Sequence, residues 1–533
     1  MKSKTTFFTL VVIFSLFACK KNATSPYSNN VIASAHPLAS EAGNAIYAQG
    51  GNAFDAAIAA AFTLSVVEPS MSGLGGRLQA IYYTSDGIIA GVDASTEVPK
   101  NYQPSEEAFR YGYQTIGIPG VVAGLLKLHK ERASLPLTTI MAPAIAHAEN
   151  GFSLLPGEAI RQQKELDKLK RFSGSAHHFL FKDSLSYSEG QTLVQKDLAN
   201  VLRKIAQEGK SGFYEGEIAQ MMVKDIQKNG GILTTEDLKN YTALEARVLK
   251  GRFQGNTIHS LYLPSFGAIT LQILQILDHL PLSKSENQWV YQLGKATELA
   301  YTYRKKQENE DSLQHILSYE NAARWAKKIN LQYNFTNTYS TKDEPISWTS
   351  IDGHTTHLST ADQWGNAVSL TQTIGPNMGS RVATKGLGFL YAVTLGGYLG
   401  DYQPGDRANS HISPTIVTRE GELIMALGAA GGSRIVTAIT QVLSRYLSQK
   451  HSLEHALELP RVYPYQDSLW IENHPGVDTL NAQFDPAQFP IKYIDEPARF
   501  GRVHAITKKN GENLWIGAAD PDWEGTTSYY SKK

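Results

Sequence analysis

Residues 354–374 read HTTHLSTADQWGNAVSLTQTI, and the remaining predictions for this chain build on this stretch. Residues alternate in 355–362 and again in 366–374, a pattern that predicts two β-strands. The tetrapeptide QWGN between them contains the glycine and asparagine that a tight turn needs. The stretch therefore predicts a β-hairpin.

Thr355 stands at the start of the first predicted strand. A threonine hydroxyl acts as a nucleophile only when a base lies beside it. If the chain is cut before Thr355, the freed α-amino group can be that base, because its unperturbed pKa is about 8. Threonine is also common in half-buried strands that have no chemistry. Spacing alone leaves both interpretations open.

The run 355–373, TTHLSTADQWGNAVSLTQT, resembles the nucleophile segment of the γ-glutamyltransferase (glutathione hydrolase) family, which belongs to the N-terminal nucleophile hydrolases. The likeness extends over nearly the whole chain, through HPLASEAG (36–43), GGNAFDAAIAAA (50–61), SGLGG (72–76), GIPG (117–120), GGILTTEDL (230–238) and GAADPDWEGTTSYY (517–530). The resemblance implies an α+β fold, the four-layer αββα sandwich, and an enzyme that uses no cofactor.

The resemblance also implies roles for single residues. Thr355 is the expected nucleophile, and its hydroxyl is expected to cut the bond between His354 and Thr355. Thr373 matches the threonine that hydrogen-bonds the nucleophile. Gly431 and Gly432 match the paired glycines of the oxyanion hole, where a turn without side chains at a helix N-terminus presents N–H groups.

Substrate-binding positions agree less well with the family. Ser410 and His411 align with a serine pair that contacts the α-carboxylate of the donor, and only the serine is kept. Four other positions that contact the charged groups of the donor glutamyl in the family, here called the head-group positions, carry different residues. Ser95 replaces an arginine, Gly375 replaces an asparagine, and Thr394 and Gly397 replace the polar and acidic pair that holds the α-amino group. These changes affect recognition of the glutamyl group and leave the nucleophile and the oxyanion hole intact.

Two arginines are candidate replacements for the carboxylate partner. Arg77 stands where the family has a glycine after SGLGG, and Arg381 follows the second predicted strand of the hairpin. Both are also ordinary choices for a surface or packing residue. Because the residues that recognise the glutamyl group are replaced, two classes of donor remain open. One is a γ-glutamyl amide such as glutathione, and the other is a different amide, as in acylases and peptide-transfer enzymes. The acceptor would be water, an amino acid or a peptide.

A cut before Thr355 predicts two subunits, residues 31–354 and 355–533, which remain together as a heterodimer. The polar stretch 330–353 would be a loop that gives the scissile bond slack. A third interpretation, a surface lipoprotein that only binds, is disfavoured because the four expected catalytic residues are all present.

The first residues predict export. Lys2 and Lys4 precede an apolar run at 7–18 that is too short to span a bilayer, so residues 1–19 are expected to be a signal peptide. The run ends in LFAC and resembles a bacterial lipobox, which makes Cys19 the expected site of lipid attachment and residues 20–30 a tether. The expected location is the cell envelope, in the periplasm or at the cell surface. Cys19 is the only cysteine, so no internal disulfide can form.

Composition excludes other classes. Lysine plus arginine equals aspartate plus glutamate at 50 each, so no charge excess points to nucleic acid. A nucleotide site is disfavoured because no lysine follows the SGLGG loop. His354 and His357 flank the nucleophile without acidic or cysteine partners at ligand spacing, and no metal site is predicted.

Periodicity predicts the remaining elements. Helices are expected at 37–49, 53–67 (capped by Asn52), 121–132, 138–150, 158–171, 193–208 and 215–228, and Thr235 is expected to cap a further turn. A hairpin is expected at 78–83 and 88–93, and strands at 503–508 and 514–519. A strand at 413–417 is expected to continue through 423–427, followed by a glycine turn at 428–434 and a helix that ends near residue 448.

Overall fold

The structure is a computed structural model that describes residues 27–104, 109–329, 354–397, 400–465, 468–473, 490–495, 500–509, 511–521 and 524–531. The predicted signal peptide with Cys19 and the predicted polar loop at 330–353 lie outside the described residues. The predicted tether ends before residue 30, because Ser28 bridges to Trp515 and the first strand begins at Asn30.

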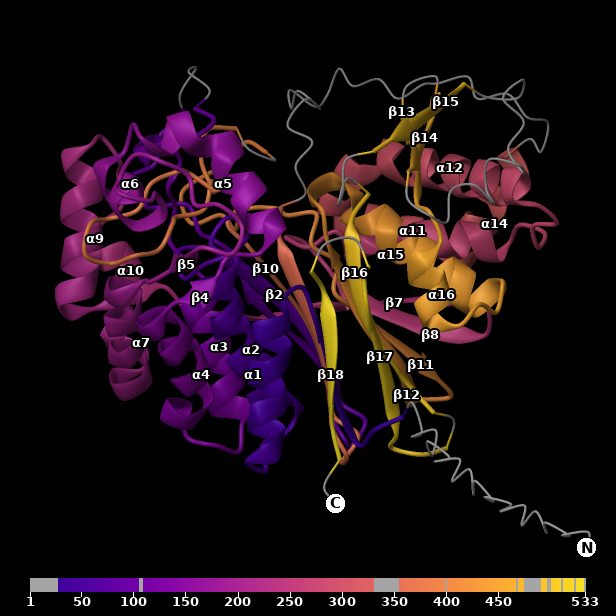
Figure 1. The fold of residues 1–533 in the computed structure, drawn as a ribbon. Coiled ribbons are helices and arrows are strands. Elements are labelled where there is room, and N and C mark those ends of the chain that lie inside the picture. The colour runs from indigo at the N-terminus through magenta and orange to yellow at the C-terminus, as the bar shows by residue number, and fades with distance from the viewer. Residues whose placement is uncertain are drawn as a thin grey trace, which may run out of the picture.

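Two antiparallel sheets lie face to face in the centre of the molecule (Figure 1). The seven-stranded sheet has the order β18 (Thr526–Tyr530), β1 (Asn30–Ser34), β9 (Thr356–Ala361), β10 (Ala367–Thr373), β2 (Arg77–Tyr83), β3 (Ile89–Ala94) and β6 (Leu244–Ala246). The six-stranded sheet has the order β17 (Trp515–Ala519), β16 (Arg502–Lys508), β12 (Glu422–Ala430), β11 (Thr415–Arg419), β8 (Asn256–Leu261) and β7 (Val248–Phe253).

Helices cover the outer face of each sheet, which completes the αββα sandwich (Figure 1). The group beside the seven-stranded sheet comprises α1 (Pro37–Ala48), α2 (Ala53–Val67), α3 (Val121–Arg132), α4 (Leu137–Asn150), α5 (Pro156–Leu169), α6 (Ser173–Phe179), α7 (Lys196–Glu208), α8 (Ser211–Tyr214), α9 (Gly216–Lys228) and α10 (Thr235–Asn240). The group beside the six-stranded sheet comprises α11 (Gly267–Asp278), α12 (Glu286–Thr302), α13 (Glu310–Leu317), α14 (Tyr319–Lys328), α15 (Ile435–Leu443) and α16 (Leu453–Glu458).

Smaller elements complete the described chain. Two strands, β4 (Phe152–Ser153) and β5 (Thr192–Leu193), pair among the helices, and β13 (Val462–Tyr465), β14 (Ser468–Glu472) and β15 (Ile491–Ile494) form a separate three-stranded sheet. Short 3₁₀ turns lie at Tyr113–Thr115, Arg304–Glu308 and Gly432–Arg434, and a π-helical turn at Ser444–Ser448 extends α15.

Three apolar clusters match the layers. One joins α2 to the outer face of the seven-stranded sheet, and a second joins α11 and α15 to the outer face of the other sheet. The third fills the space between the sheets and includes Val31, Ile81, Ile416 and Trp515. Burial of these side chains is the main force that holds the four layers together.

The hairpin predicted within residues 355–374 forms as expected. Strands β9 and β10 pair antiparallel, with Ala361 opposite Ala367, and Gly365 in the turn has a φ of 96°. The helix predicted at 53–67 is α2, and the side chain of Asn52 accepts hydrogen bonds from the N–H groups of Phe54 and Asp55. The described residues contain no helix that is both long and apolar enough to cross a membrane.

Three local predictions were wrong. The cap of α10 is Thr234, whose hydroxyl accepts from the N–H of Asp237, so Thr235 is already the first helical residue. The residues at 423–427 do not continue the strand before them, because β12 turns back and pairs antiparallel with β11. Residues 428–430 belong to β12 and not to a turn, because they pair with β16, and the turn begins only at Gly431.

Candidate active site

Thr355 immediately precedes β9 and is buried, with 3% of its surface exposed. Its φ is 97°. A β-branched residue rarely adopts a positive φ, because its side chain crowds the backbone, and such a conformation costs on the order of 1–3 kcal/mol. The backbone is therefore strained directly after the bond between His354 and Thr355.

The hydroxyl of Thr355 has a defined partner. Its Oγ1 donates a hydrogen bond of 3.0 Å to Oγ1 of Thr373, the last residue of β10. The same Thr373 oxygen accepts a 3.0 Å hydrogen bond from the backbone N–H of Gly375. The hairpin brings the start of β9 beside the end of β10, so one hydroxyl orients the other.

The carbonyl group of His354 contacts the glycine turn after β12. The backbone N–H of Gly431 donates a hydrogen bond of 2.9 Å to the carbonyl oxygen of His354. A donor at this distance would stabilise negative charge on that oxygen if the carbonyl were attacked. The Thr355 hydroxyl and the Gly431 N–H thus lie at the same peptide bond.

Geometry requires glycine in this turn. Gly431 has a φ of 142°, and a Cβ atom on it would lie 2.6 Å from Cα of Gly501, closer than atoms can approach. Gly432 has a φ of 59°, in the left-handed region that favours glycine. A Cβ on Gly432 would lie 3.6 Å from Cδ2 of His354, so this residue also borders the site.

A small hollow surrounds these groups. Its walls come from the seven-stranded sheet, from the segments that follow β10 and precede β11, and from the turn and helix that follow β12. They consist of Arg77, His354, Thr355, Thr373, Gly375, Ser410, His411, Gly432 and Ile435. The structure therefore brings most of the residues that the sequence analysis singled out to one place.

Arg77 is the first residue of β2 and lies directly opposite Thr373 in the antiparallel ladder. Directly paired side chains leave a sheet on the same face, so both point toward the hollow. The guanidinium group is fully buried and donates through Nη1 to the carbonyl oxygen of Asn409 at 3.1 Å and through Nη2 to that of Val393. A cation is therefore held in the wall beside Thr355.

Ser410 and His411 form another part of the wall. The N–H of Ser410 donates to the carbonyl oxygen of Pro264 at 2.8 Å, which ties this segment to the turn before α11. The ring of His411 packs edge-on against Phe266, with 4.8 Å between ring centroids. Burial, with smaller contributions from Arg304 and His354, lowers the pKa of His411 to about 3, so its ring is neutral near pH 7.

Comparison with known proteins shows the family to which this chain belongs. Residues 39–530 match the model of the family described as "Gamma-glutamyltranspeptidase". The chain belongs to the gamma-glutamyltranspeptidase family. The match spans both sheets and both helical layers, so the fold and the enzyme class come from the whole chain and not from one motif.

Similar proteins within this family act on different donors. The chain is 29% identical to "Glutathione hydrolase proenzyme" of Bacillus subtilis over 93% of this chain and 91% of that protein. It is also 29% identical to "Acylase ACY 1 proenzyme" of a Pseudomonas species, over 96% of this chain and 95% of that protein. Among solved structures, the cephalosporin acylase from Bacillus halodurans superposes with a TM-score of 0.86 at 25% identity and covers 98% of this chain, with 100% of that chain matched.

Positions that depart from the family pattern have other partners here. Among the four replaced head-group residues, only Gly375 lines the hollow in the described chain. Ser95 is fully buried, accepts from the side chain of Gln79 at 3.0 Å and donates its N–H to Asp93 at 2.9 Å. Thr394 is fully buried, and a Cβ on Gly117 would lie only 2.6 Å from its methyl carbon.

Arg381 lies outside the hollow of this family member. Its Nε forms an ion pair with Glu165 at 2.9 Å, and its Nη1 donates to the carbonyl oxygen of Gly379 at 2.6 Å. Its guanidinium also lies over the ring of Tyr111. The structure thus brings Arg77, and not Arg381, to the candidate site.

A buried charge cluster next to Thr355 was missed by sequence reasoning. The hydroxyl of Thr356 donates to Glu68 at 2.6 Å, and guanidinium nitrogens of Arg161 and Arg502 lie 3.8 and 3.7 Å from the same carboxylate. Burial raises the pKa of Glu68, and the two arginines oppose that shift. The signal in the sequence was an acidic residue directly after the apolar helix α2.

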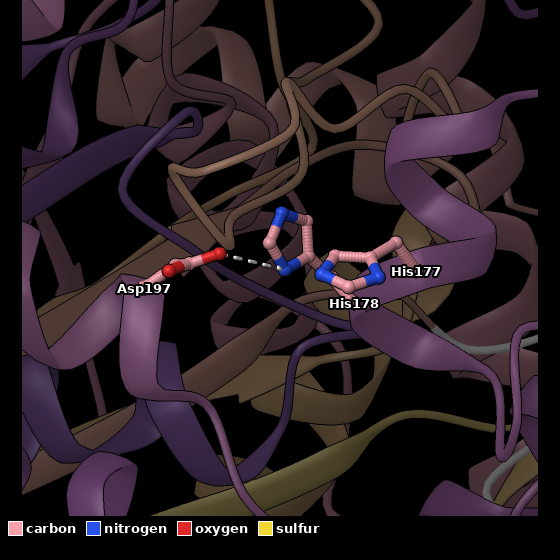
Figure 2. Close-up of side chains that lie close together, drawn as sticks. All are labelled: His177, His178 and Asp197. Carbon is pink, nitrogen blue, oxygen red and sulfur yellow. Dashed lines mark ion pairs between the residues drawn. The ribbon is translucent and has the colours of Figure 1, made fainter.

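One group of described residues has the composition of a metal site, at His177, His178 and Asp197 (Figure 2). It lies at the end of α6 and the start of α7, apart from the hollow. Nε2 of His178 accepts from the backbone N–H of Gly386 at 3.2 Å, so the neutral ring carries its proton on Nδ1, which faces Asp197 at 3.9 Å. A metal bound at Nδ1 of His178 would have to displace that proton.

Proposed function

We propose that the chain is a self-processing enzyme that cuts its own bond between His354 and Thr355 and then cleaves amide donors through an acyl-enzyme on Thr355. The observation that carries this proposal is the 2.9 Å hydrogen bond from the N–H of Gly431 to the carbonyl oxygen of His354. It resembles the arrangement of a substrate amide in an oxyanion hole, with the chain's own peptide bond as the substrate.

Self-cleavage would proceed in two steps. Oγ1 of Thr355 attacks the carbonyl carbon of His354, the N–H of Gly431 stabilises the oxyanion, and the C–N bond breaks as the nitrogen takes up the hydroxyl proton. The ester that results joins His354 to the Thr355 side chain, and water hydrolyses it to a new carboxylate and a free hydroxyl. The strained φ of 97° at Thr355 supports this step, because cutting the bond releases the strain.

Turnover would reuse the same atoms. The freed α-amino group of Thr355 takes the hydroxyl proton when Oγ1 attacks the donor amide, and it returns that proton to the leaving amine. Thr373 orients the hydroxyl, and the amides of Gly431 and Gly432 bind the oxyanion. Water then releases the acid, or an amino acid or peptide amine takes the acyl group.

The subunits would be residues 31–354 and 355–533. The strand order supports their staying together, because β1 lies between β18 and β9, and β10 pairs with β2. In the other sheet, β8 pairs with β11. Each sheet therefore contains strands from both sides of the cut. The word "proenzyme" in the names of the relatives fits this processing.

Two donor classes follow from the relatives. A γ-glutamyl amide such as glutathione is the first candidate, after the glutathione hydrolase of Bacillus subtilis. A different amide is the second, after the acylases. The engagement of Ser95 with Gln79 and Asp93 favours the second, because this residue stands where the family has its carboxylate-binding arginine.

The deciding experiment is a denaturing gel with N-terminal sequencing of protein that lacks residues 1–19. We expect two bands, the smaller beginning at Thr355, and one band in Thr355→Ala. Thr360→Ala is the matched control, because Thr360 is also buried in β9 but its hydroxyl donates to the carbonyl oxygen of Ala53, away from the cut. A single uncut band in the unaltered protein would leave only the interpretation as a binding lipoprotein.

We also propose that the enzyme is exported and attached to the cell envelope through a lipid on Cys19. This rests on the residues before position 20, namely Lys2, Lys4, the apolar run and LFAC. Mass spectrometry of the N-terminal peptide tests it directly. We expect an acylated Cys19 and partition into detergent, and Cys19→Ser should remain in the aqueous phase.

A further inference from the structure

A pocket separate from the hollow at Thr355 lies in the helical layer beside the six-stranded sheet, the layer that includes α12 and α14 (Figure 1). Its volume is about 570 Å³, within the range of about 300–1,000 Å³ that small-molecule sites occupy. Its wall comes from the 3₁₀ turn at Arg304–Glu308 with the residue before it, from α13 and from α14. Among the described residues, none lines both this pocket and the hollow.

One face of α14 forms part of the pocket wall. Asn321 lines the pocket, and so do Arg324, Trp325 and Lys328, which follow it by three, four and seven residues. Residues at this spacing lie above one another on a helix, so their side chains reach the same volume. Lys327 points elsewhere, because it is exposed and does not line the pocket. This face therefore presents an amide, an aromatic ring and two cations together.

Asn321 carries a polar group without a partner. The residue is buried, with 3% of its surface exposed, and its Nδ2 has no hydrogen-bond partner among the described residues. A buried N–H without an acceptor is rare, because it has lost its bonds with water and gained none. Since Asn321 lines the pocket, an acceptor atom bound there would supply the missing partner.

Part of the pocket wall is apolar. Trp325 is buried, and its ring stacks on that of Tyr303 with 4.8 Å between the centroids and 16° between the planes. Ile316 of α13 is also buried and lines the same pocket. Surface of this kind favours an apolar group, because contact removes both from water. The stack also holds the residue before the 3₁₀ turn against α14, so this wall is formed before a ligand binds.

The charges in the wall are mainly positive. Lys306, Arg324 and Lys328 line the pocket, against one carboxylate, that of Asp311. None of the three cations forms an ion pair with a described residue, and Nζ of Lys306 lies over the ring of Tyr303, 5.0 Å from its centroid. An anion would gain charge-assisted hydrogen bonds here, whereas a cation would be repelled. Surface cations are common, and these indicate a ligand because they surround the unpartnered amide of Asn321.

We propose that this pocket binds an organic anion, in which a carboxylate or phosphate group is attached to an apolar body of one or two rings. The anionic oxygens accept from Nδ2 of Asn321 and pair with Arg324 and Lys328. The apolar body packs on Tyr303 and Trp325. The proposal is independent of the proposed function, because every residue of this wall lies before the predicted cut and outside the hollow.

Four small probes test the charge and the apolar body separately. They are 2-naphthoate, the neutral 2-naphthylmethanol, the cationic 2-naphthylmethylammonium, and acetate, which lacks the rings. We expect 2-naphthoate to bind at least about tenfold more tightly than each of the others, the lower limit for one charge-assisted hydrogen bond. Titration calorimetry measures the dissociation constants. Equal affinity for 2-naphthoate and 2-naphthylmethanol would overturn the proposal. A comparison of 2-naphthoate with 2-naphthyl phosphate then distinguishes a carboxylate ligand from a phosphate ligand.

Variants at exposed residues locate the binding in this pocket. Arg324→Gln combined with Lys328→Gln should weaken binding of 2-naphthoate at least about tenfold and leave 2-naphthylmethanol binding unchanged, because only charge is removed. Lys327→Gln is the matched control, because it removes an exposed cation from the same helix outside the pocket wall. An affinity that survives in the double variant, or that falls equally in the control, would contradict the proposal.

Asn321→Leu separates a ligand contact from a structural role. The change roughly keeps the size of the side chain and removes the buried N–H. We expect binding of 2-naphthoate to weaken about tenfold, while the midpoint of urea unfolding without ligand does not fall, because the unpartnered N–H stabilises nothing in the free protein. A midpoint that falls while 2-naphthoate binding is kept would show that Asn321 is structural and would refute its role in binding.

The Thr355→Ala protein distinguishes this pocket from the hollow. We expect it to bind 2-naphthoate as tightly as the unaltered protein, because the pocket wall contains no residue of the hollow. Weaker binding in Thr355→Ala would assign the probe to the hollow and overturn the proposal. A chain that does not cut itself but binds 2-naphthoate as expected would refute the proposed function alone.

Discussion

The carbonyl oxygen of His354 accepts a 2.9 Å hydrogen bond from the N–H of Gly431, and these two residues adjoin strands of different sheets. His354 leads into β9 of the seven-stranded sheet, and Gly431 follows β12 of the six-stranded sheet. The distance therefore depends on how the two sheets pack together, and the candidate site exists only when both are folded against each other.

Enlarging Gly431 should stop self-cleavage. In Gly431→Ala the new Cβ would lie 2.6 Å from Cα of Gly501, so the turn must move and the hydrogen bond to His354 is lost. Loss of one oxyanion donor typically costs about 10²- to 10³-fold in rate. The rate of appearance of the small subunit on a gel measures this. Gly421→Ala is the control, because Gly421 also has a positive φ, 87°, but nothing lies within 4 Å of its added Cβ. Equal slowing in both variants would contradict the prediction.

Removing the hydroxyl of Thr373 should slow both processing and turnover. Thr373→Val takes away the oxygen that Thr355 and Gly375 both contact, each at 3.0 Å. We expect kcat to fall about tenfold and KM to change little, because the donor contacts remain. Steady-state kinetics measures both constants. Thr63→Val tests for general damage, since the Thr63 hydroxyl donates within α2 to the carbonyl oxygen of Ala59.

Neutralising Glu68 should destabilise the fold. Its carboxylate accepts from Thr356 and lies within 4 Å of Arg161 and Arg502, all of them buried. Breaking a buried charge pair typically costs about 3–5 kcal/mol. We expect Glu68→Gln to lower the midpoint of urea unfolding clearly and Thr356→Val to lower it less, because that change removes one hydrogen bond and leaves the charges paired. A midpoint that Glu68→Gln leaves unchanged would contradict this.

Stability should fall in mild acid. Burial lowers the pKa of His357 and of His411 to about 3, against an ordinary value of 6.5. The folded state therefore binds fewer protons than the unfolded state between these values. The stability that the neutral rings contribute is complete above about pH 6.5 and is lost as pH falls toward 3. Each such ring should remove about 1.4 kcal/mol per pH unit in this window. Urea unfolding of the Thr355→Ala protein at several pH values measures the slope, and a flat profile below pH 6 would contradict it.

Much of the fold could be predicted from local patterns. Alternation predicted β9 and β10, and Gly365 marked the turn that joins them. Asn52 marked the start of α2 because its short side chain caps the first turn. Local patterns failed to predict secondary structure where the choice between a turn and a strand depends on pairing with a distant segment. Residues 428–430 look like a glycine turn, and only pairing with β16 makes them a strand.

The residues of the candidate site also differ in how well the sequence predicts them. Thr355, Thr373, Gly431 and Gly432 could be named from the motifs that resemble the family, because each needs a particular residue type at a particular spacing. Arg77 could be named only as one of two candidates. Its register opposite Thr373 and the ion pair of Arg381 with Glu165 distinguish them, and neither is visible in the order of residues.

Most helices and strands, the hairpin that follows Thr355 and the glycines at 431 and 432 could be found from the order of residues, because periodicity, capping and backbone freedom are local properties. Which distant groups meet follows from tertiary packing alone: the carbonyl of His354 with Gly431, the carboxylate of Glu68 with Arg161 and Arg502, and the side chain of Arg77 with the hollow. These contacts join residues from both sheets and from the helical layer beside the seven-stranded sheet. Burial of the apolar faces between the layers brings them together, and no local pattern encodes that packing.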